Sequence, residues 1–385
     1  MASPRWSDFG SIWKTIREVD VLAIRREAEH DLTVACAGDR EALEYVRGLL
    51  LDGPDRYPSL FTALGLVPLD QVHARERLIS EADLLLVALR HDVSLSPAEV
   101  AGLERLESAS PRRRLLVLVG EPPAPARSWL RRLDEGKTLV IRPGAAGSPD
   151  RLAAAVLEAL PPQRQLAAAR RLPGLRLQYA RRLTAEVSLS NGAFALASGV
   201  PSLVPILGVP ITAADTVVLT KNQALMVYRL ALAFGAPPEF QRRMMEITPV
   251  IGAAVVWRQV AGGLVGLVPG YGILPKTAVA FAGTYITGRA AELWYATGLV
   301  SKGDMRRISA EATAKARSMA GEQARRAREA RDAAGRARRA TTRVRESARR
   351  LTRRGGPRVT PDGSPADQPA PEAFPDAPPA PPEKD

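Results

Sequence analysis

Short apolar runs alternate with longer amphipathic stretches between residues 31 and 160. Each run is rich in Val and Leu and is bounded by breaking residues, which predicts buried strands at Leu32–Ala37, Ala82–Leu89, Leu115–Val119 and Leu139–Arg142. The stretches between the runs predict helices at Arg40–Leu51, Pro97–Ser108, Ala126–Asp134 and Pro149–Leu160. This alternation indicates an α/β domain with a parallel sheet and helices on both faces.

Two of these predicted helices begin with a proline. The first turn tolerates Pro97 and Pro149, because the N–H that proline lacks has no partner inside the helix at that position. Ser96 and Ser148 come directly before them and are expected to be the N-caps.

Helix dominates the prediction for the second half. A Pro-Pro pair at 161–162 ends the alternating pattern, and Gln163–Val187 is amphipathic with a break expected at Pro173-Gly174. From Ser188 to Leu299 the composition shifts to Ala, Gly, Val and Leu with few charges, which favours an all-α, Gly/Ala-rich hydrophobic domain. Gly235 is typical of a helix C-cap.

The two ends of the chain have patterns of their own. Residues 1–30 are expected to hold an amphipathic helix, docked on the body or anchored at a membrane interface, from the spacing of Trp6, Phe9, Trp13 and Ile16. Lys302–Arg354, here called the basic segment, is rich in Ala, Arg and Glu and predicts one long helix. Gly355–Asp385, the tail, is Pro-rich and acidic, which predicts disorder.

The formal net charge of +13 is concentrated in one place. The basic segment carries 18 basic and 6 acidic residues, the tail carries 2 and 6, and residues 1–301 carry 34 and 29. The body is therefore nearly balanced, and the charge marks an appendage rather than a basic fold.

The sequence contains few of the cysteine and histidine residues that metal sites and disulfides require. Cys36 is the only cysteine, so no internal disulfide can form and a reducing compartment is expected. His30, His73 and His91 lack the spacing of a zinc site. No metal site and no cofactor are predicted.

The layout of the first half resembles a Ras-like P-loop GTPase domain. Glu81–Val87 is similar to the strand after switch II, Leu115–Val119 to the strand before the guanine-reading loop, and Ile141–Leu160 to the last strand and helix. The family's phosphate loop would fall at Gly38–Tyr45, its switch II acid at Asp70, and its guanine-reading motif at Val119–Pro122.

None of those three positions has the residues that nucleotide chemistry needs. A phosphate loop requires a second Gly, a Lys and a Ser or Thr, whereas this chain offers Asp39, Glu41 and Glu44. The Gly-x-Gly-x-x-Gly pattern of dinucleotide-binding sheets is also absent. We therefore expect a degenerate G-domain-like sheet with no nucleotide-binding and no catalytic residues, in which Gly38 and Asp70 are turn residues.

Spaced motifs in the second half resemble the YcjF-like domain of unknown function, which is often found C-terminal to bacterial GTPase domains. The resemblance covers about Gly192–Gly298 and implies no catalytic role, since no activity is established for the family. The motif residues, whose role is unknown, are Pro210, Asp215, Lys221, Asn222, Gln223, Arg258, Pro269, Gly270 and Gly272.

Three of these motif residues invite a physical interpretation. Asp215 and Asn222 are seven residues apart and share a helix face, with Gln223 beside them. They form either a satisfied polar network between packed helices or a ligand or ion site. Nearby His, Cys or a second carboxylate would support the site, and there are none. Thr212 is expected to cap the helix, with Asp215 closing a capping box.

The hydrophobic half also raises the question of a membrane. Ala193–Ile211 is uncharged over 19 residues, but three prolines interrupt it. A small-residue pattern follows at Gly262, Gly266 and Gly270. Arg289 and Glu292 have the spacing of an ion pair, and Trp294-Tyr295 would then lie at a lipid interface. Membrane association without full spanning is expected, and a compact water-soluble helical domain is the competing picture.

The basic segment has three candidate roles. It is a solvated helix, a helix attracted to anionic lipid, or a binder of nucleic-acid phosphates. No aromatic residues are interleaved for base stacking, so nucleic acid is the least favoured partner.

These patterns together predict five parts, at 1–30, 31–160, 163–300, 302–354 and 355–385. We expect a non-catalytic, membrane-associated scaffold or regulator on the cytoplasmic face, built from a pseudo-GTPase domain and a YcjF-like domain, with an anionic lipid surface and a protein as partners. One alternative is a GTP-binding switch with atypical loops. The other is a soluble cytoplasmic protein that binds nucleic acid through the basic segment. No small-molecule substrate is predicted.

Overall fold

The computed structural model describes residues 21–57, 64–108, 113–120, 138–197, 213–239, 242–243 and 273–354. The predicted features outside these ranges include the apolar stripe of the first twenty residues, the helix at Ala126–Asp134 and the disorder of the tail. By its contacts the chain divides into two compact units, Met1–Ala324 and Arg325–Asp385.

The first unit contains a five-stranded sheet in which every strand pair is parallel. Its strands are β1 (Val34–Gly38), β2 (Leu64–Pro68), β3 (Leu84–Arg90), β4 (Arg114–Val119) and β5 (Thr138–Ile141), in the spatial order β2-β1-β3-β4-β5. The predicted α/β character and four predicted strands are confirmed. The hydrophobic pattern does not indicate β2, because Gly65 and Pro68 are typical breakers of a strand. Pro68 is tolerated because β2 lies at the edge of the sheet.

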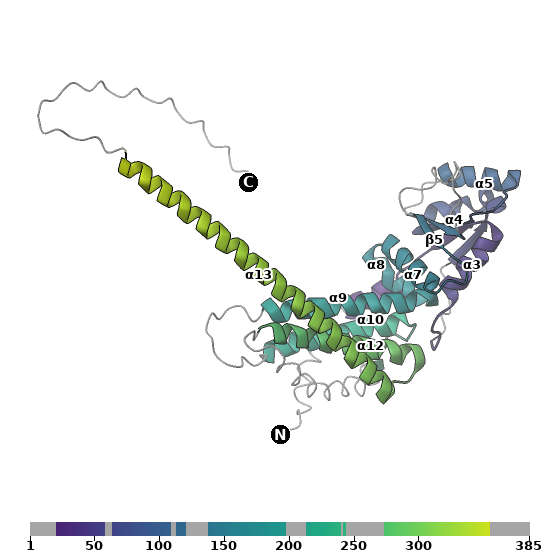
Figure 1. Cartoon of the computed structure of the whole chain (residues 1–385). Coiled ribbons are helices and arrows are strands. Elements are labelled where there is room, and N and C mark those ends of the chain that lie inside the picture. The colour runs from purple at the N-terminus through teal and green to yellow at the C-terminus, as the bar shows by residue number, and fades with distance from the viewer. Residues whose placement is uncertain are drawn as a thin grey trace, which may run out of the picture. The chain divides into compact units, whose positions relative to one another are not determined.

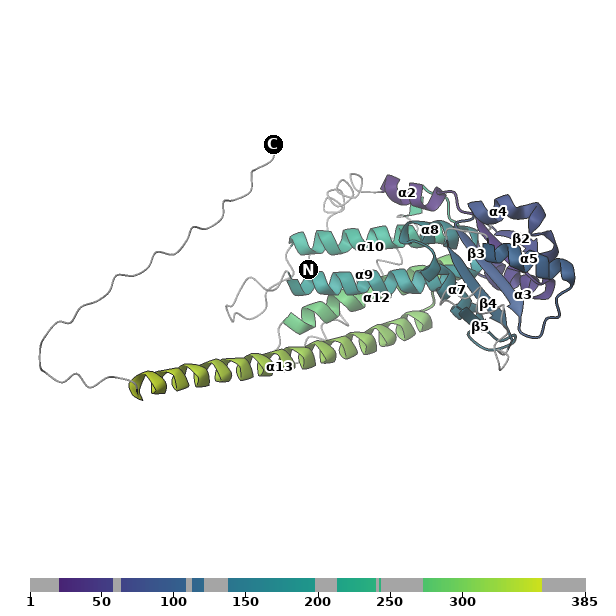
Figure 2. The same cartoon turned by 90° about the horizontal axis from the view of Figure 1, so that it is seen from above.

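Helices cover both faces of the sheet (Figures 1 and 2). Alternate side chains of β1 point to opposite faces: Val34 and Cys36 join the core cluster that also holds residues of α3 (Arg40–Leu51) and α7 (Ser148–Ala159). Ala35 and Ala37 face a second cluster. The second cluster is completed by Leu69 of a 3₁₀ turn (Leu69–Gln71), by α4 (Glu76–Glu81) and by α5 (Pro97–Ser108). A further 3₁₀ turn spans His73–Arg75.

The two predicted N-caps had different outcomes. Ser96 and Glu99 form a capping box at α5, because Glu99 Oε2 accepts from Ser96 N at 2.8 Å while Ser96 Oγ accepts from Glu99 N at 3.4 Å. Ser148 is not a cap: the N-cap of α7 is Gly147, whose φ of +89° suits glycine. The Ser148 hydroxyl is buried and donates to the carbonyl of Arg142.

The all-helical part combines α2 (Val21–Glu29), which precedes the sheet in the chain, with the helices that follow the sheet. After the sheet come α8 (Pro162–Arg171), a 3₁₀ turn (Pro173–Leu175), α9 (Arg176–Ala197), α10 (Ala213–Ala233) and α12 (Ile273–Thr297). The break expected at Pro173-Gly174 is confirmed by that turn. Helices α9, α10 and α12 lie side by side and pack on one another (Figure 2). Gly235 ends α10 as predicted, with φ of +86° and a bond from Ala236 N to Ala231 O.

A single hydrophobic core joins the sheet to these helices. One cluster of buried residues runs from Val34 and Leu86 in the sheet through Leu166 of α8 to Tyr228 of α10 and Tyr295 of α12. Arg176, at the start of α9, is buried and donates to the carbonyls of Pro54 and Tyr57, which follow α3. Burial lowers the pKa of Arg176 to about 10, so this guanidinium is charged at neutral pH.

Helix α13 (Lys302–Arg354) is the long helix that the basic segment predicts, and it is confirmed over 53 residues. Its first turns dock on α12 through Ile308, Ala312 and Ala316, which pack on Phe281, Ala282, Tyr285 and Ile286. The Tyr285 hydroxyl donates to Glu311 Oε1 at 2.6 Å and accepts from Lys315 Nζ at 2.6 Å. The basic segment therefore begins as a packed helix, which none of its three candidate roles included.

Helices α9 and α12 approach each other closely at Gly288. A Cβ atom on Gly288 would lie 2.4 Å from Thr184 Oγ1 and 2.5 Å from Thr184 Cγ2. Thr184 is fully buried and β-branched in a helix, so it has few rotamers with which to move aside.

Gly288→Ala should therefore lower the free energy of unfolding by about 1–3 kcal/mol, because overpacking forces the two helices apart. The matched control is Gly48→Ala in α3, where no atom lies within 4 Å of an added Cβ. That change should raise stability by about 0.5–1 kcal/mol through helix propensity alone. Urea denaturation followed by circular dichroism measures both; equal effects of the two variants would contradict the close packing.

Candidate functional site

The carboxyl ends of β1 and β3 are the first place to look for a ligand site. In doubly wound parallel sheets ligands bind where the strand order reverses, and here it reverses beside β1, which lies between β2 and β3. Only Asp39 separates the end of β1 at Gly38 from the start of α3 at Arg40. The strand therefore passes into the helix without an intervening loop.

Asp39 is the N-cap of α3. Its carboxylate is buried and accepts hydrogen bonds from Ala42 N at 3.1 Å, from Arg90 N at 2.7 Å and from Arg90 Nε at 3.1 Å. A second guanidinium nitrogen of Arg90 donates to Glu41 at 2.8 Å. The partial positive charge of the helix N-terminus, which can hold an anion, is thus already neutralised by a carboxylate.

Two further positions of the expected nucleotide loops, Asp70 and Gly120, have contacts of their own. Asp70, the residue at the expected switch II position, accepts from Arg40 at 3.3 Å on the exposed surface. Gly120, at the expected guanine-reading position, has φ of +109° and lies against the ring of His91. Across the described ranges, no group of three or more His, Cys, Asp or Glu residues could hold a metal ion.

The motif residues of the helical part meet at a different place. Asn222 and Gln223 on α10 face Asn191 on α9 and Thr284 on α12. Asn222 Nδ2 donates to Asn191 Oδ1 at 2.7 Å, Asn191 Nδ2 donates to Thr284 Oγ1 at 2.8 Å, and Gln223 Nε2 donates to Thr284 Oγ1 at 3.2 Å. The network expected for Asn222 and Gln223 is present and joins all three helices.

Thr284 is the centre of this network. Its buried hydroxyl donates to the Ala280 carbonyl at 2.9 Å and accepts from two amides, so its full hydrogen-bonding capacity is used. Asn191 is buried as well, and both of its amide atoms are bonded within the network. A network satisfied in this way fixes the register of the three helices and leaves no atom at its centre to bind an ion.

The remaining motif residues add little to this geometry. Lys221 is half-buried on α10 beside Asn222. Asp215 lies in the first turn of α10, but its side chain is outside the described residues, as is Thr212. Five further motif residues also lie outside them, namely Pro210, Arg258, Pro269, Gly270 and Gly272. The sequence singled out neither Asn191 nor Thr284; a polar residue in an otherwise uncharged helical stretch was the only available signal.

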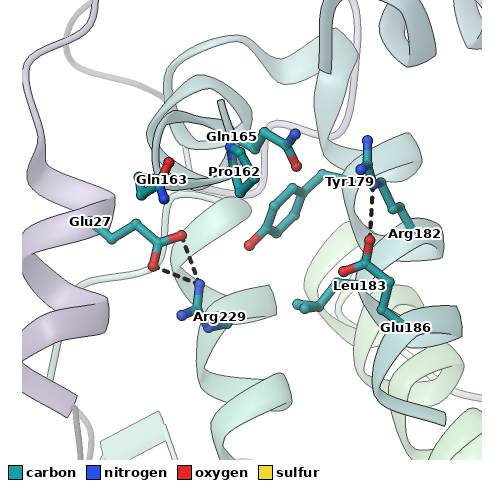
Figure 3. Close-up of a pocket in the computed structure, with 9 residues that line it drawn as sticks. All are labelled: Glu27, Pro162, Gln163, Gln165, Tyr179, Arg182, Leu183, Glu186 and Arg229. Atoms are coloured by element: carbon teal, nitrogen blue, oxygen red, sulfur yellow. Dashed lines mark hydrogen bonds and ion pairs between the residues drawn. The ribbon is translucent and has the colours of Figure 1, made fainter. Parts of the chain in front are cut away.

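A cleft of about 350 Å³ opens between α2, α8, α9 and α10 (Figure 3). Its charged side chains are paired with each other: Glu27 accepts from Arg229 Nη1 at 2.7 Å through both oxygens, and Glu186 accepts from Arg182 Nε at 3.0 Å. Burial raises the pKa of Tyr179, whose hydroxyl points toward Arg229. The phenol is therefore neutral, and the cleft presents no uncompensated charge to a ligand.

The membrane-related predictions had mixed outcomes. The Arg289–Glu292 ion pair is present, and burial raises the pKa of Glu292 while Arg289 opposes that rise. The placement of Tyr295 at a lipid interface is wrong, because Tyr295 is fully buried and stacks on Phe234 with ring centroids 6.3 Å apart. Within the ranges that the structure covers, no helix has both the length and the hydropathy to cross a bilayer. Residues 198–212 and 262–270 lie outside those ranges.

No protein-family model matches the chain, and no curated protein matches it. The YcjF-like and GTPase-like resemblances therefore stay predictions that rest on the residues themselves.

The network makes Thr284→Val a costly substitution. It preserves shape but removes the acceptor of two buried amides, which should cost about 2–3 kcal/mol of unfolding free energy. Thr287→Val is the matched control, since the Thr287 hydroxyl is buried on the same helix and makes the same bond to a carbonyl one turn back. That control should cost about 1 kcal/mol or less. Thermal and urea unfolding compare them; similar losses would show that the amides do not depend on Thr284.

Proposed function

We propose that this protein is a non-catalytic scaffold or regulator, built from a pseudo-GTPase α/β domain and a YcjF-like helical domain and held at the anionic cytoplasmic face of a membrane. The observation that carries the first part is the closed junction between β1 and α3. A triphosphate would need a loop of free backbone N–H groups and a cation at that place.

The chemistry of the junction opposes phosphate in two ways. Asp39 would have to give up three hydrogen bonds, and its buried carboxylate would then face a second negative charge. Arg90 is a cation at the junction, but both Asp39 and Glu41 already form ion pairs with it. In this proposal the sheet retains the strand and helix order of a nucleotide-binding domain, and the Asp39 carboxylate occupies the place where such a domain would bind phosphate.

The sheet supports a GTPase-like framework at the level of layout. From β1 to β4 the described strands and helices alternate along the chain, as they would in such a domain. Helices cover both faces of the sheet. The strand order is also that of flavodoxin-like sheets, so the framework alone carries no activity. A scaffold role fits a domain whose ligand edge is filled by its own side chains.

The helical part supports a role in assembly rather than chemistry. Asn222 and Gln223, two of the YcjF-like motif residues, are used to bind α10 to α9 and α12. The cleft beside α2 has its acids and arginines paired internally. Neither place offers the free nucleophile or base that a catalytic step requires.

Attraction to a membrane is proposed from the charge of α13. We call its portion in the second unit, Arg325–Arg354, the arm; it has thirteen arginines against three acidic residues. At a rise of about 1.5 Å per residue this helix is roughly 45 Å long. Each Arg close to an anionic leaflet contributes about 1 kcal/mol of attraction, which is screened by salt.

Titration with labelled GTP and magnesium tests the pseudo-GTPase part. The closed junction predicts no saturable binding in the micromolar range by fluorescence anisotropy. Saturable micromolar binding would instead favour the alternative, a switch protein with atypical loops.

Flotation with lipid vesicles tests the membrane part. Changing Arg336, Arg339 and Arg343 to Gln should reduce recovery with phosphatidylserine vesicles at least threefold, because each lost charge weakens attraction to the anionic surface. The matched control changes Arg26, Arg75 and Arg151 to Gln, three exposed arginines of the body, and so removes the same charge elsewhere.

The control variant should float like the original chain, and vesicles of phosphatidylcholine alone should recover neither. Equal losses in both variants would show that only net charge matters. Preferential retention of a nucleic acid by the arm, with no flotation, would reject the lipid surface as the partner.

A further inference from the structure

Several exposed arginines of the arm are unpaired among the described residues. Arg325, Arg336, Arg339 and Arg343 are all exposed, and none of them forms an ion pair or hydrogen bond with another described residue. Acidic residues do stand within helical reach, at Glu329, Asp332 and Glu346, yet they are too few to neutralise the helix.

These arginines lie mainly on one side of the helix. At about 100° per residue, Arg325, Arg336, Arg339 and Arg343 all fall within roughly a quarter of the circumference, and eight of the other nine arginines extend the same face to about half of it. Ala333, Ala337 and Ala340 fall on another side and are exposed too. The arm therefore presents a cationic face beside a face of small residues that offers little apolar area, so its binding is electrostatic.

The tail carries the complementary charge directly after this helix. Gly355–Asp385 has six acidic and two basic residues and follows Arg354 directly in the sequence. An extended Pro-rich chain of this length reaches roughly 95 Å, about twice the length of the arm. Its acids can thus come close to any arginine of the arm.

We propose that the acidic tail docks on the arginine face of the arm and competes there with the anionic surface that the arm binds. The consequence for membrane binding rests on the proposed function, whereas the contact between tail and arm does not. Because the tail is tethered, its effective concentration at the arm is about millimolar, so even a weak electrostatic contact is populated.

The charge of the arm favours the tail over a second copy of the arm as the segment that docks on the arginine face. Two arms would bring thirteen arginines against thirteen, and like charges at helix–helix distance repel. The body is nearly balanced, with 34 basic and 29 acidic residues up to residue 301, so it offers no comparable acidic run. The tail is therefore the segment of this chain that has both a negative charge and enough length to contact the arm.

The test neutralises the tail in the full-length chain. Asp362, Asp367 and Asp376 are changed to Asn and Glu372 to Gln, which removes four negative charges. A matched control changes Glu76, Asp92, Glu104 and Glu158, four exposed acids of the body, to their amides. If the tail occupies the arm about two thirds of the time, the apparent affinity of the arm for vesicles is about threefold weaker than that of a free arm. The tail variant should therefore float with phosphatidylserine vesicles about threefold better at low salt.

A fluorescence measurement reports the contact without any lipid. Cys36 is fully buried, so dyes attach to cysteines introduced by Ala337→Cys in the arm and Ala380→Cys in the tail. Energy transfer should be high at low salt, fall as salt is added, and be low at all salt concentrations when the tail is neutralised.

The two measurements separate the two hypotheses. If energy transfer depends on tail charge but no variant floats, the tail contact stands and the proposed membrane role fails. If the original chain floats while neutralising the tail changes neither flotation nor energy transfer, the membrane role stands and the tail proposal is overturned. An equal gain in the body control would also overturn it, since bulk charge would then explain the effect.

Discussion

The burial of α8 between the sheet and the helices is the constraint on which the rest of this structure depends. Its Leu166–Ala169 face is fully buried in the core that both parts share, and its polar side chains close the ends of neighbouring elements. Gln165 donates to the last carbonyls of α7, Arg170 to the C-terminal carbonyls of α10 and Arg171 to those of α2. A buried helix end needs such partners, so one ten-residue helix fixes where three others stop.

This arrangement gives the two edges of the sheet different characters. At the amino edge Arg164 contacts the Asp31 carbonyl and Asp83, which precede β1 and β3, so the helices are attached there. At the carboxyl edge Asp39 and Arg90 join β1, α3 and β3 to each other. The edge that in related sheet architectures receives a ligand is therefore used to hold the fold together, which is why the proposal assigns the domain to assembly and not to catalysis.

Helix α13 combines two physical regimes in one continuous element. Up to Met319 it is held by apolar contacts with α12 and by the Tyr285, Glu311 and Lys315 group. In that group the hydrogen bond from Tyr285 lowers the pKa of Glu311, so the contact is present at neutral pH and is lost only as pH falls through that lowered value. Beyond Ala324 the helix carries thirteen arginines against three acidic residues, so long-range charge replaces apolar packing as its main interaction.

Hydrophobic periodicity and breaking residues located α3 and α5 to the residue and four of the strands nearly so, and composition predicted the full length of α13. The sequence also indicated that Asn222 and Gln223 belong to a packed network and that the phosphate loop is absent. Three contacts became visible only in the folded chain. Asn191 and Thr284 complete the network, Arg90 donates hydrogen bonds to Asp39, and Ile308 packs on α12. Those pairs lie 93, 51 and more than 20 residues apart, and no periodic pattern encodes which distant groups meet. Local propensity acts over a few residues, whereas burial and hydrogen-bond satisfaction are settled only when the whole core closes.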